Sequence, residues 1–190
     1  PVLLQFPMGE GAEFAGIVDL LKMELVTYGD DLGTAIESHP IPESLREEAE
    51  TRRAEMIEKI VENDDFLTEK YLEGQAINDE ELVAALRDAT IKGKVQPVLC
   101  GSALKNKGVQ LMLDKVVELL PSPLDIPPVK GRDPKTDEVL YRSASDDEPV
   151  TALVFKILTD PYVGRLAFFR VYSGVVKAGS TLMNTTKGNR

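Results

Sequence analysis

The 190-residue sequence has few of the residue types on which most catalytic centres depend: it contains one cysteine, one histidine and no tryptophan. A single cysteine, Cys100, excludes an internal disulfide and is typical of a reducing compartment. A single histidine, His39, leaves no second imidazole for a zinc site and disfavours an independent hydrolase or metalloenzyme. We expect Cys100 to be a small core residue, and His39, which precedes Pro40, to lie in an extended loop facing solvent.

Long apolar runs and positive charge are also scarce. No run approaches the roughly 18 apolar residues that a membrane helix needs, and no signal-peptide pattern occurs. Lys and Arg number 22 against 32 Asp and Glu, which gives a net charge of −10. Because a DNA-binding surface needs clustered Lys and Arg to neutralise phosphates, this balance argues against DNA and leaves room for a basic partner. We expect a soluble, cytoplasmic protein without a membrane partner.

Residues 94–121 are the most informative stretch. The apolar run 95–100 predicts a buried strand, and Gly101-Ser102-Ala103 predicts a tight turn after it. A stripe with helical spacing then follows, and prolines at 121 and 123 end it. The stripe consists of Val109, Met112, Leu113, Val116, Val117 and Leu120. A strand, a turn and a helix form half of an α/β unit, in which ligands bind at the carboxyl ends of strands.

The first 93 residues combine strand and helix patterns. Residues 1–6, 14–20 and 22–28 are rich in β-branched and aromatic residues and predict strands of one sheet, with 34–38 as a further candidate. Helical periodicity begins after Pro42, where Ser44 and Glu47 match a capping box. The buried face of this helix is predicted to contain Leu45, Ala49, Met56 and Ile60.

Two shorter helices are expected after this one. The first covers residues 65–72 and is stopped by Gly74. The second starts at Asn78 with Glu81 and ends at Gly93; its predicted buried residues are Leu82, Val83, Leu86 and Ala89.

An acidic face is predicted opposite the apolar face of the first helix. It gathers Glu47, Glu48, Glu55, Glu58, Glu62 and, if the helix reaches that far, Asp65. Glu58 and Glu62 are a like-charge pair four residues apart, which costs a few tenths of a kcal/mol. Two interpretations are open: an ordinary solvated helix face, or a docking surface for a basic partner.

The last third of the sequence changes to a period of two. After a proline-rich connector, Leu153, Phe155 and Ile157 alternate with less apolar neighbours, as in a strand with two unlike faces. Residues 166–172 and 175–184 predict further strands, with turns at Asp160-Pro161 and Ser173-Gly174. Three strands do not close a barrel.

Three strings carry a resemblance to a known family, and they occur in the family's order. CGSALKNKGVQLMLD at residues 100–114 resembles the guanine-base loop of translation elongation factor G. LPSPLDIPPVKG at 120–131 resembles that family's connector out of the GTPase domain. ASDDEPVTALVFKILTDPYVGRLAFFRVYSGVVKAG at 144–179 resembles the opening strands of its second domain.

The resemblance implies a domain plan. Residues 1–93 would be an α/β (α+β) insert subdomain of the GTPase domain, and 94–120 the last strand and helix of that P-loop domain. Residues 121–147 would be the connector, and 148–190 the incomplete start of an antiparallel β-barrel, domain II. A barrel opened in this way should leave an unpaired edge and exposed residues such as Phe168 or Phe169, so self-association is expected.

The resemblance also implies a function, that of the GTPase that moves tRNA and mRNA through the ribosome. Ser102, Ala103 and Leu104 would bind guanine, and the parent would use GTP or GDP with magnesium. Glu58, Glu62 and Asp65 would contact the C-terminal domain of the ribosomal stalk protein, with Asp65 standing where the family commonly has Glu. The barrel start would contact ribosomal RNA or the GTPase domain.

Several motifs of a working GTPase are missing. No G-x-x-x-x-G-K-[ST] phosphate loop occurs, and Asn106-Lys107-Gly108-Val109 lacks the final Asp of Asn-Lys-x-Asp. Asp30-Asp31-Leu32-Gly33 fits D-x-x-G by letters only. We therefore expect an internal piece of a longer protein that is not catalytic alone. The alternatives are a piece of another translational GTPase, of the ribosome-protection or release type, and a free-standing acidic interaction module.

Overall fold

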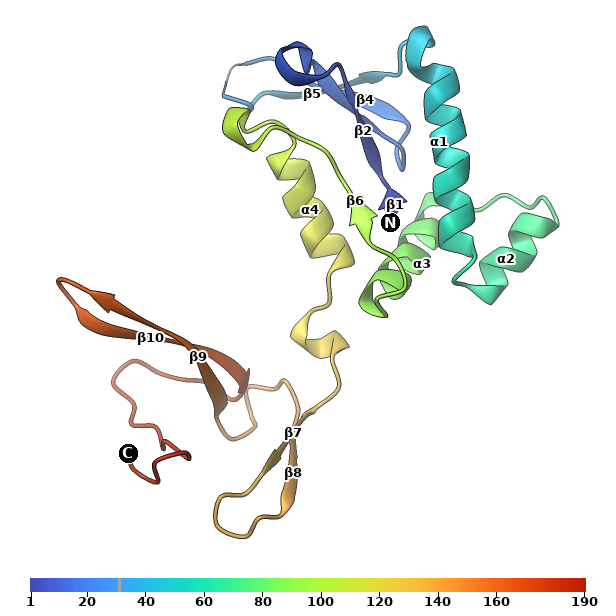
Figure 1. Ribbon diagram of the computed structural model, residues 1–190. Helices are drawn as coiled ribbons and strands as arrows, with labels where there is room; N and C mark the ends of the chain where they lie inside the picture. Colours follow the sequence, from blue (N-terminus) through green and yellow to red (C-terminus); the bar gives the residue numbers. More distant parts are fainter. Residues whose placement is uncertain (31) are drawn as a thin grey trace. The chain divides into compact units, whose positions relative to one another are not determined.

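The computed structural model describes residues 1–30 and 32–190, so Asp31 of the Asp30–Gly33 string lies outside the described residues. The chain divides into two compact units, Pro1–Leu120 and Pro121–Arg190, and each is described by itself. Figure 1 labels their helices and strands. No helix in the described part of the chain is both long and apolar enough to cross a membrane.

The first unit contains a four-stranded antiparallel sheet in the order β2-β3-β4-β5. Its strands are β2 (Gln5–Met8), β3 (Gly16–Asp19), β4 (Glu24–Tyr28) and β5 (Ile36–Pro40), and a short 3-10 turn, η1 (Gly11–Glu13), joins the first two. Ile17 pairs with Val26 and Val18 with Phe6, which fixes the register of the central strands. The predicted strands at 14–20 and 22–28 and the candidate at 34–38 are therefore confirmed as one sheet.

The start of the chain departs from that expectation. β1 (Val2–Leu3) leaves the sheet and pairs in parallel with β6 (Pro97–Val98), as Val2 with Pro97 and Leu3 with Val98. The prediction of a buried strand over residues 95–100 was wrong in length and in burial, because β6 has two residues and both are half-buried. A parallel strand is normally covered on both faces by its neighbours, and β6 has one partner strand in the described chain.

Three helices follow the sheet: α1 (Glu43–Val61), α2 (Asp65–Leu72) and α3 (Asp79–Ile91). The predicted Ser44–Glu47 capping box is wrong, since α1 starts two residues earlier than a cap at Ser44 requires and its N-cap, Pro42, makes no side-chain cap. The carbonyl of Pro42 accepts a hydrogen bond from Leu45 N at 2.9 Å. The box at Asn78 and Glu81 is present, because Glu81 N donates to Asn78 Oδ1 at 2.8 Å and Asn78 N to Glu81 Oε2 at 3.1 Å.

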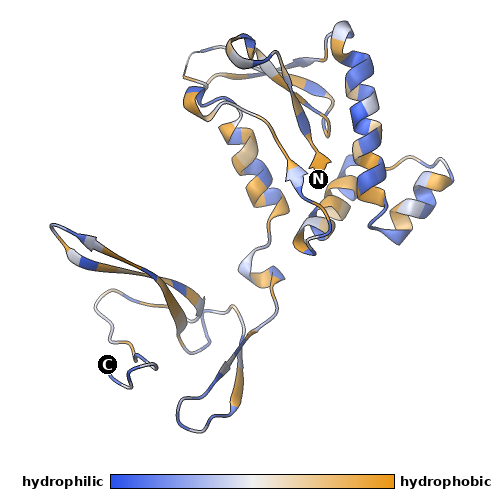
Figure 2. Cartoon of the chain, viewed as in Figure 1, coloured by the Kyte–Doolittle hydropathy of each residue, from blue (hydrophilic) through white to orange (hydrophobic). Residues whose placement is uncertain are grey.

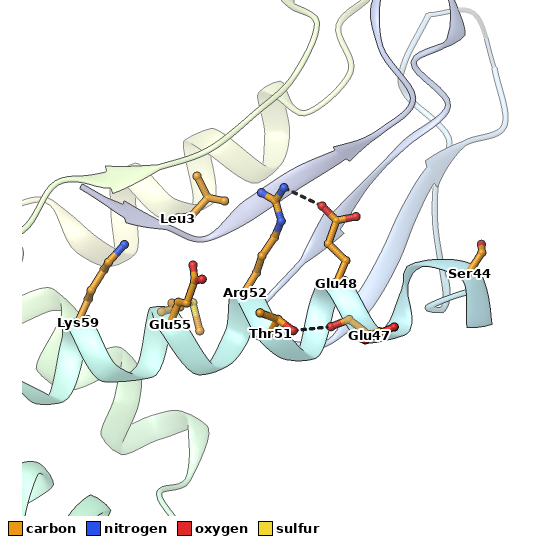
Figure 3. A pocket seen from close by; sticks show the side chains of 9 residues that line it. Leu3, Ser44, Glu47, Glu48, Thr51, Arg52, Glu55 and Lys59 are labelled. Atoms are coloured by element: carbon orange, nitrogen blue, oxygen red, sulfur yellow. Dashed lines mark hydrogen bonds and ion pairs between the residues drawn. The ribbon is translucent and has the colours of Figure 1, made fainter.

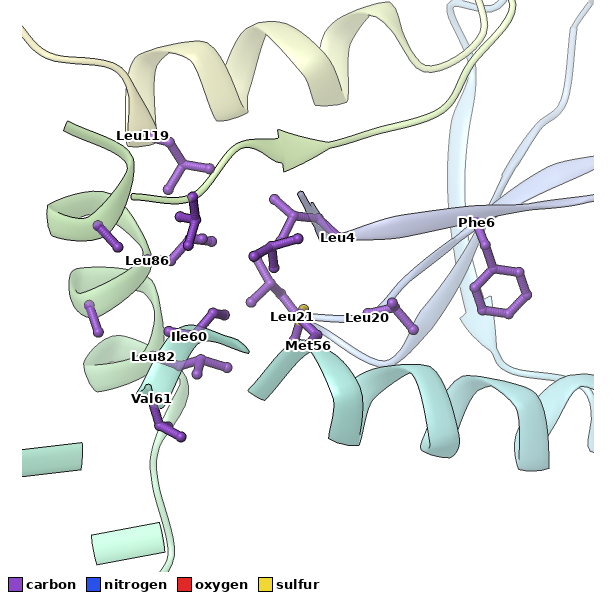
Figure 4. Packing of buried hydrophobic residues seen from close by; sticks show 14 of the residues in the cluster. Leu4, Phe6, Leu20, Leu21, Met56, Ile60, Val61, Leu82, Leu86 and Leu119 are labelled. Carbon is purple, nitrogen blue, oxygen red and sulfur yellow. The ribbon is translucent and has the colours of Figure 1, made fainter. Parts of the chain in front are cut away.

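The core of the first unit lies between the sheet, the ends of β1 and the inner faces of α1 and α3 (Figure 4). Its largest fully buried side chains include Leu4, Leu20, Met56, Ile60, Leu82, Leu86 and Leu119. The Arg53 guanidinium donates to the carbonyls of Leu20 and Leu21 and also contacts Asp79 at 3.0 Å, which links the β3–β4 turn to both helices.

The last helix of this unit, α4 (Val109–Leu119), is amphipathic as predicted but its apolar stripe is largely exposed. Val117 is 83% exposed, whereas Leu119, which the stripe omitted, is 2% exposed. Arg87 of α3 donates to the carbonyls of Glu118 at 2.9 Å and Leu120 at 3.1 Å, which holds the end of the helix. Figure 2 shows apolar residues along α4.

The second unit consists of a 3-10 turn, η3 (Pro123–Asp125), and two antiparallel hairpins. The shorter pairs β7 (Val129–Arg132) with β8 (Val139–Arg142), and the longer pairs β9 (Thr151–Asp160) with β10 (Gly164–Ser173). The predicted strand at 175–184 was wrong: this segment has only the isolated bridge of Asn184 with Asn189, because no neighbouring strand is available to it. Phe168 and Phe169 are exposed, as expected for an open ribbon.

Candidate functional site

The loop after β6 closes on itself at the carboxyl end of that strand. Ser102 N donates to the Lys107 carbonyl at 2.8 Å, and Lys107 N donates to the Ser102 carbonyl at 3.0 Å. Between them lies the 3-10 turn η2 (Ala103–Lys105), in which Lys105 N also donates to Ser102 O at 3.1 Å. Ser102 is half-buried at the base of this loop, and Leu104 at its tip is 99% exposed.

The loop offers two main-chain donors to a ligand. The N–H groups of Ala103 and Leu104 come before the first hydrogen bond within η2, so the turn itself does not satisfy them. A hollow of about 180 Å³ adjoins the loop, and Ala103 lines it together with Leu99, Cys100, Gly101, Lys107, Gly108, Val109 and Met112. Of the two residues with these N–H groups, Ala103 lines the hollow and Leu104 does not.

Two residues under the loop shape the hollow without chemical reactivity of their own. Burial raises the pKa of the Cys100 thiol to about 11, so that the thiol stays protonated near neutral pH and is a poor nucleophile. Gly101 is required by a close approach, because a Cβ there would lie 2.7 Å from the Lys107 carbonyl oxygen. Neither residue therefore supplies a nucleophile or an acid–base group at this loop.

Sequence reasoning missed the contacts that hold this loop from below. Tyr28 at the end of β4 and the segment after it contact Asn106, Gly108 and Gln110. Asn106 has a left-handed backbone with φ of 53°, a conformation for which Asn is one of the favoured residues. Asn106 was therefore the one residue of these contacts that sequence could have pointed to, as a turn residue. Tyr28 could not be linked to the loop, because it lies 80 residues from its partner, Gly108.

The three acidic candidates lie at the junction of α1 and α2. Glu58 is on the last turns of α1, Glu62 is its C-cap and Asp65 is the first residue of α2. The expected acidic face along one helix is thus interrupted after Glu62, because Asp64 caps a new helix by accepting from Leu67 N at 3.0 Å. All three carboxylates are exposed.

Tyr71 of α2 ties the two helices together at this junction. Its hydroxyl donates to Glu58 Oε1 at 3.1 Å, and this hydrogen bond raises the pKa of Tyr71. Glu58 is therefore held in place by α2, while Glu62 and Asp65 follow it along the surface. The structure brings the three residues to one junction but not onto one helix.

A charged groove of about 550 Å³ runs along another part of α1, beside Leu3 of β1 (Figure 3). Glu47, Glu48 and Glu55 line it, so these members of the predicted acidic face have neighbours of opposite charge. Arg52 pairs with Glu48 at 2.6 Å, and Lys59 lies at the far end of the groove. Glu58, Glu62 and Asp65 do not line this groove.

Comparison with known proteins agrees with an α/β unit next to antiparallel strands of translation-factor type. Residues 149–190 match the family model "Elongation factor G domain 2". A crystal structure of a protein from Thermus thermophilus is similar with a TM-score of 0.72 and 30% sequence identity, over 94% of this chain and 24% of that chain. The chain therefore spans about a quarter of that protein's length.

These similarities define the class of the molecule first: a mixed α/β structure followed by antiparallel strands that match a translation elongation factor domain. The resemblance to elongation factor G is confirmed by them. For residues 149–190 the similarity is to the second domain of elongation factor G, a factor of protein biosynthesis.

Proposed function

We propose that residues 1–190 work within a translational GTPase of the elongation factor G kind, which uses GTP to move tRNA and mRNA through the ribosome in the cytoplasm. In this proposal Ser102, Ala103 and Leu104 form part of the guanine pocket. The observation that carries it is the closed Ser102–Lys107 loop with the Ala103 and Leu104 N–H groups at its tip. Residues 1–93 are then the insert of the GTPase domain, 94–120 its last strand and helix, and 148–190 the start of domain II.

The exposed side of α4 supports the P-loop part of this proposal. Met112, Val116 and Val117 form an apolar face that the described residues of the first unit cover only in part, since their exposures are 42%, 41% and 83%. β6 likewise has one partner strand in the described chain. A parallel sheet with helices on its faces would cover both, and it is the architecture in which nucleotides bind at the carboxyl ends of strands. The phosphates and magnesium would be held by residues outside this sequence, so the segment alone should not hydrolyse GTP.

Replacing Ala103 by proline tests the guanine site. Proline removes the Ala103 N–H and breaks no bond of the loop, because the first position of a helical turn tolerates it and Ser102 is already extended (φ −121°, ψ 95°). In the full factor, GDP affinity should fall about tenfold, as expected for one lost hydrogen bond in a buried contact. Isothermal titration with GDP measures it.

Ala103→Gly is the matched variant because it keeps the N–H group, and its loss of affinity should be clearly smaller. Equal GDP affinity of the proline and glycine variants would show that Ala103 N–H does not contact the nucleotide. Binding of GDP by the 190-residue chain alone, as tightly as by the full factor, would contradict the division of the pocket proposed here.

We also propose the acidic junction as the contact for the C-terminal domain of the ribosomal stalk protein, with ribosomal RNA as a neighbour of the second unit. Glu58, Glu62 and Asp65 are exposed, and no Lys or Arg in the described chain is paired with them in a salt bridge. A basic partner would be attracted before contact, which mainly raises the association rate. Ribosome-stimulated turnover by Glu58→Gln/Glu62→Gln should slow by about two- to tenfold at low salt and less at high salt.

The charged groove on α1 supplies the control for that experiment. Glu47→Gln/Glu55→Gln removes the same charge from the same helix, but at positions that face the groove with Arg52 and Lys59. Stopped-flow association with purified stalk protein should be slower for the junction variant than for the groove variant. Equal rates would mean that only net charge matters and that the junction is no docking site.

A further inference from the structure

The Ser102–Lys107 loop is held by the insert sheet through contacts between residues about 80 positions apart. Tyr28 Oη accepts a hydrogen bond from Gly108 N at 2.5 Å. Asn106 Nδ2 donates to the Leu32 carbonyl at 3.0 Å, and Gln110 Nε2 donates to the Gly33 carbonyl at 3.0 Å. We call these six residues the brace: Tyr28, Leu32 and Gly33 on the insert, and Asn106, Gly108 and Gln110 on the loop and α4.

The backbones of the brace also approach one another closely at two glycines. Gly33 is buried, has a φ of +65°, and a Cβ there would lie 2.5 Å from the Asn106 carbonyl oxygen. Gly108 has a φ of +86°, and a Cβ there would lie 2.9 Å from both Ile17 Cδ1 and the Cys100 carbonyl oxygen. Lys107 adds its ammonium at 5.8 Å from the centre of the Tyr28 ring. An added Cβ at either glycine would therefore meet atoms of the opposite side of the brace or of the sheet.

The brace contacts the Asn106–Gly108 end of the loop and makes no hydrogen bond to Leu104 at its tip. Asn106 and Gly108 flank Lys107, which is the residue that closes the loop on Ser102. Ala103 and Leu104, with their unused N–H groups, lie on the opposite limb. The position of these donors therefore depends on where Tyr28 and Gly33 hold Asn106 and Gly108.

We propose that the insert sheet positions the guanine loop, with Tyr28 and Gly33 as positioning residues that set nucleotide affinity without contacting the nucleotide. The inference rests on the proposed function of Ser102, Ala103 and Leu104 and adds a role for the insert beyond docking. It follows that the insert and the base pocket are mechanically linked: a change in the insert that moves Tyr28, Leu32 or Gly33 changes the pocket.

Gly33→Ala and Gly74→Ala test the link as a matched pair. Both glycines have similar positive φ, +65° and +69°, so both alanines impose a comparable backbone strain. Only the Gly33 substitution meets a neighbour, since nothing lies within 4 Å of a Cβ at Gly74. In the full factor, Gly33→Ala should weaken GDP binding about tenfold or more, and Gly74→Ala should leave it within about twofold.

Tyr28→Phe isolates one bond of the brace, because it keeps the ring beside Lys107 and removes the acceptor of Gly108 N. GDP affinity should fall about three- to tenfold, and the Gly108 amide should exchange faster with solvent, while the amides of α3 keep their protection. Tyr162→Phe, at an exposed tyrosine of the β9–β10 turn, should change neither quantity.

The outcomes separate the two proposals. If the wild-type factor binds GDP and Gly33→Ala and Tyr28→Phe bind it equally well, the positioning role is wrong and the guanine site stands. Equal losses in Gly33→Ala and Gly74→Ala would also overturn it, since strain alone would then explain the effect. If the wild-type factor binds no GDP, the proposed function fails, and the positioning role fails with it.

Discussion

Both units of this chain contain regularly spaced apolar residues, but their side chains are largely buried in the first unit and exposed in the second. Every apolar residue described as buried lies in Pro1–Leu120, where a sheet packs against α1 and α3. In Pro121–Arg190 the long ribbon of β9 and β10 leaves Phe155 66% exposed, and Ile157 is exposed to a similar degree. A two-stranded ribbon has no second layer to cover either face, and isolated hairpins are at best marginally stable.

The comparison shows that regularly spaced apolar side chains are buried only where a second layer of structure packs against them. The exposed stripe of α4 repeats the lesson inside the first unit: where α3 reaches it, Leu119 is buried, and elsewhere Val117 is open. Exposed apolar surface of this kind marks a place where another part of a protein packs. In an isolated chain it favours self-association, as expected for the open ribbon.

Two Leu→Ala substitutions, one in each unit, test whether buried apolar side chains stabilise only the first unit. Leu86 is 0% exposed in the first unit and Leu153 is 56% exposed on β9. Leu86→Ala should lower the free energy of unfolding of the first unit by about 2–5 kcal/mol, because it removes buried methyl groups and leaves a cavity. Urea denaturation followed by far-UV circular dichroism measures the change.

Leu153→Ala is the control for this measurement, and it should leave the transition of the first unit unchanged. Two equal destabilisations would show that the second unit has a core coupled to that of the first.

Amide hydrogen exchange gives an independent check, since Ile17 and Val18 in the central strand should be protected far longer than the amides of β9 and β10.

The elements that could be predicted are those set by local sequence. The helices at Glu43–Val61 and Asp79–Ile91 follow from apolar spacing, and the Asn78–Glu81 box follows from two residues three apart. What failed was non-local. No pattern in residues 1–6 tells that Val2 and Leu3 pair with β6 about 95 positions later, and residues 175–184 have strand character but no partner.

The candidate site divides along the same line. The turn at Ser102 and Ala103 was recognisable because Gly, Ser and Ala follow an apolar run, and the structure closes it as a loop. Tyr28 and Gly33 could not be assigned to it, because their contacts join segments that are far apart in sequence. The break between Glu62 and Asp65 was missed since Asp64 looks like one more acidic residue until its cap to Leu67 N is seen.

Two capping boxes, one in each unit, sharpen the comparison further. Asn78 caps α3, whereas Ser122 caps the three-residue turn η3 by the same reciprocal pattern. Asn78→Ala should destabilise the first unit by about 0.5–2 kcal/mol, because α3 is part of its core. Ser122→Ala and Ser44→Ala should leave the same thermal transition in place, the latter since Ser44 caps nothing. A comparable loss in Ser44→Ala would restore the rejected box at Glu47.

The smallest expected effect is on how the stability of the first unit changes at acidic pH. The Lys70 ammonium, which donates to both oxygens of Glu81 at 2.8 Å, and then the Asn78 N–H hold the pKa of Glu81 below its usual range. A carboxylate with a lowered pKa stabilises the folded state above its usual pKa, and that contribution is lost as pH falls through the lowered value. Glu81→Gln should therefore reduce the loss of stability of the first unit between about pH 5 and pH 3.

Asp160 in the second unit gives the contrast, because its pKa is lowered in the same direction by the N–H groups of Val163 and Tyr162. Its turn is attached to no core, so Asp160→Asn should leave the acid dependence of the main transition as it is. Thermal unfolding followed by far-UV circular dichroism from about pH 3 to about pH 7 compares the two variants with the parent. If Asp160→Asn flattens the curve as much as Glu81→Gln does, folding of the ribbon is coupled to the core of the first unit, and the contrast between the two units has to be given up.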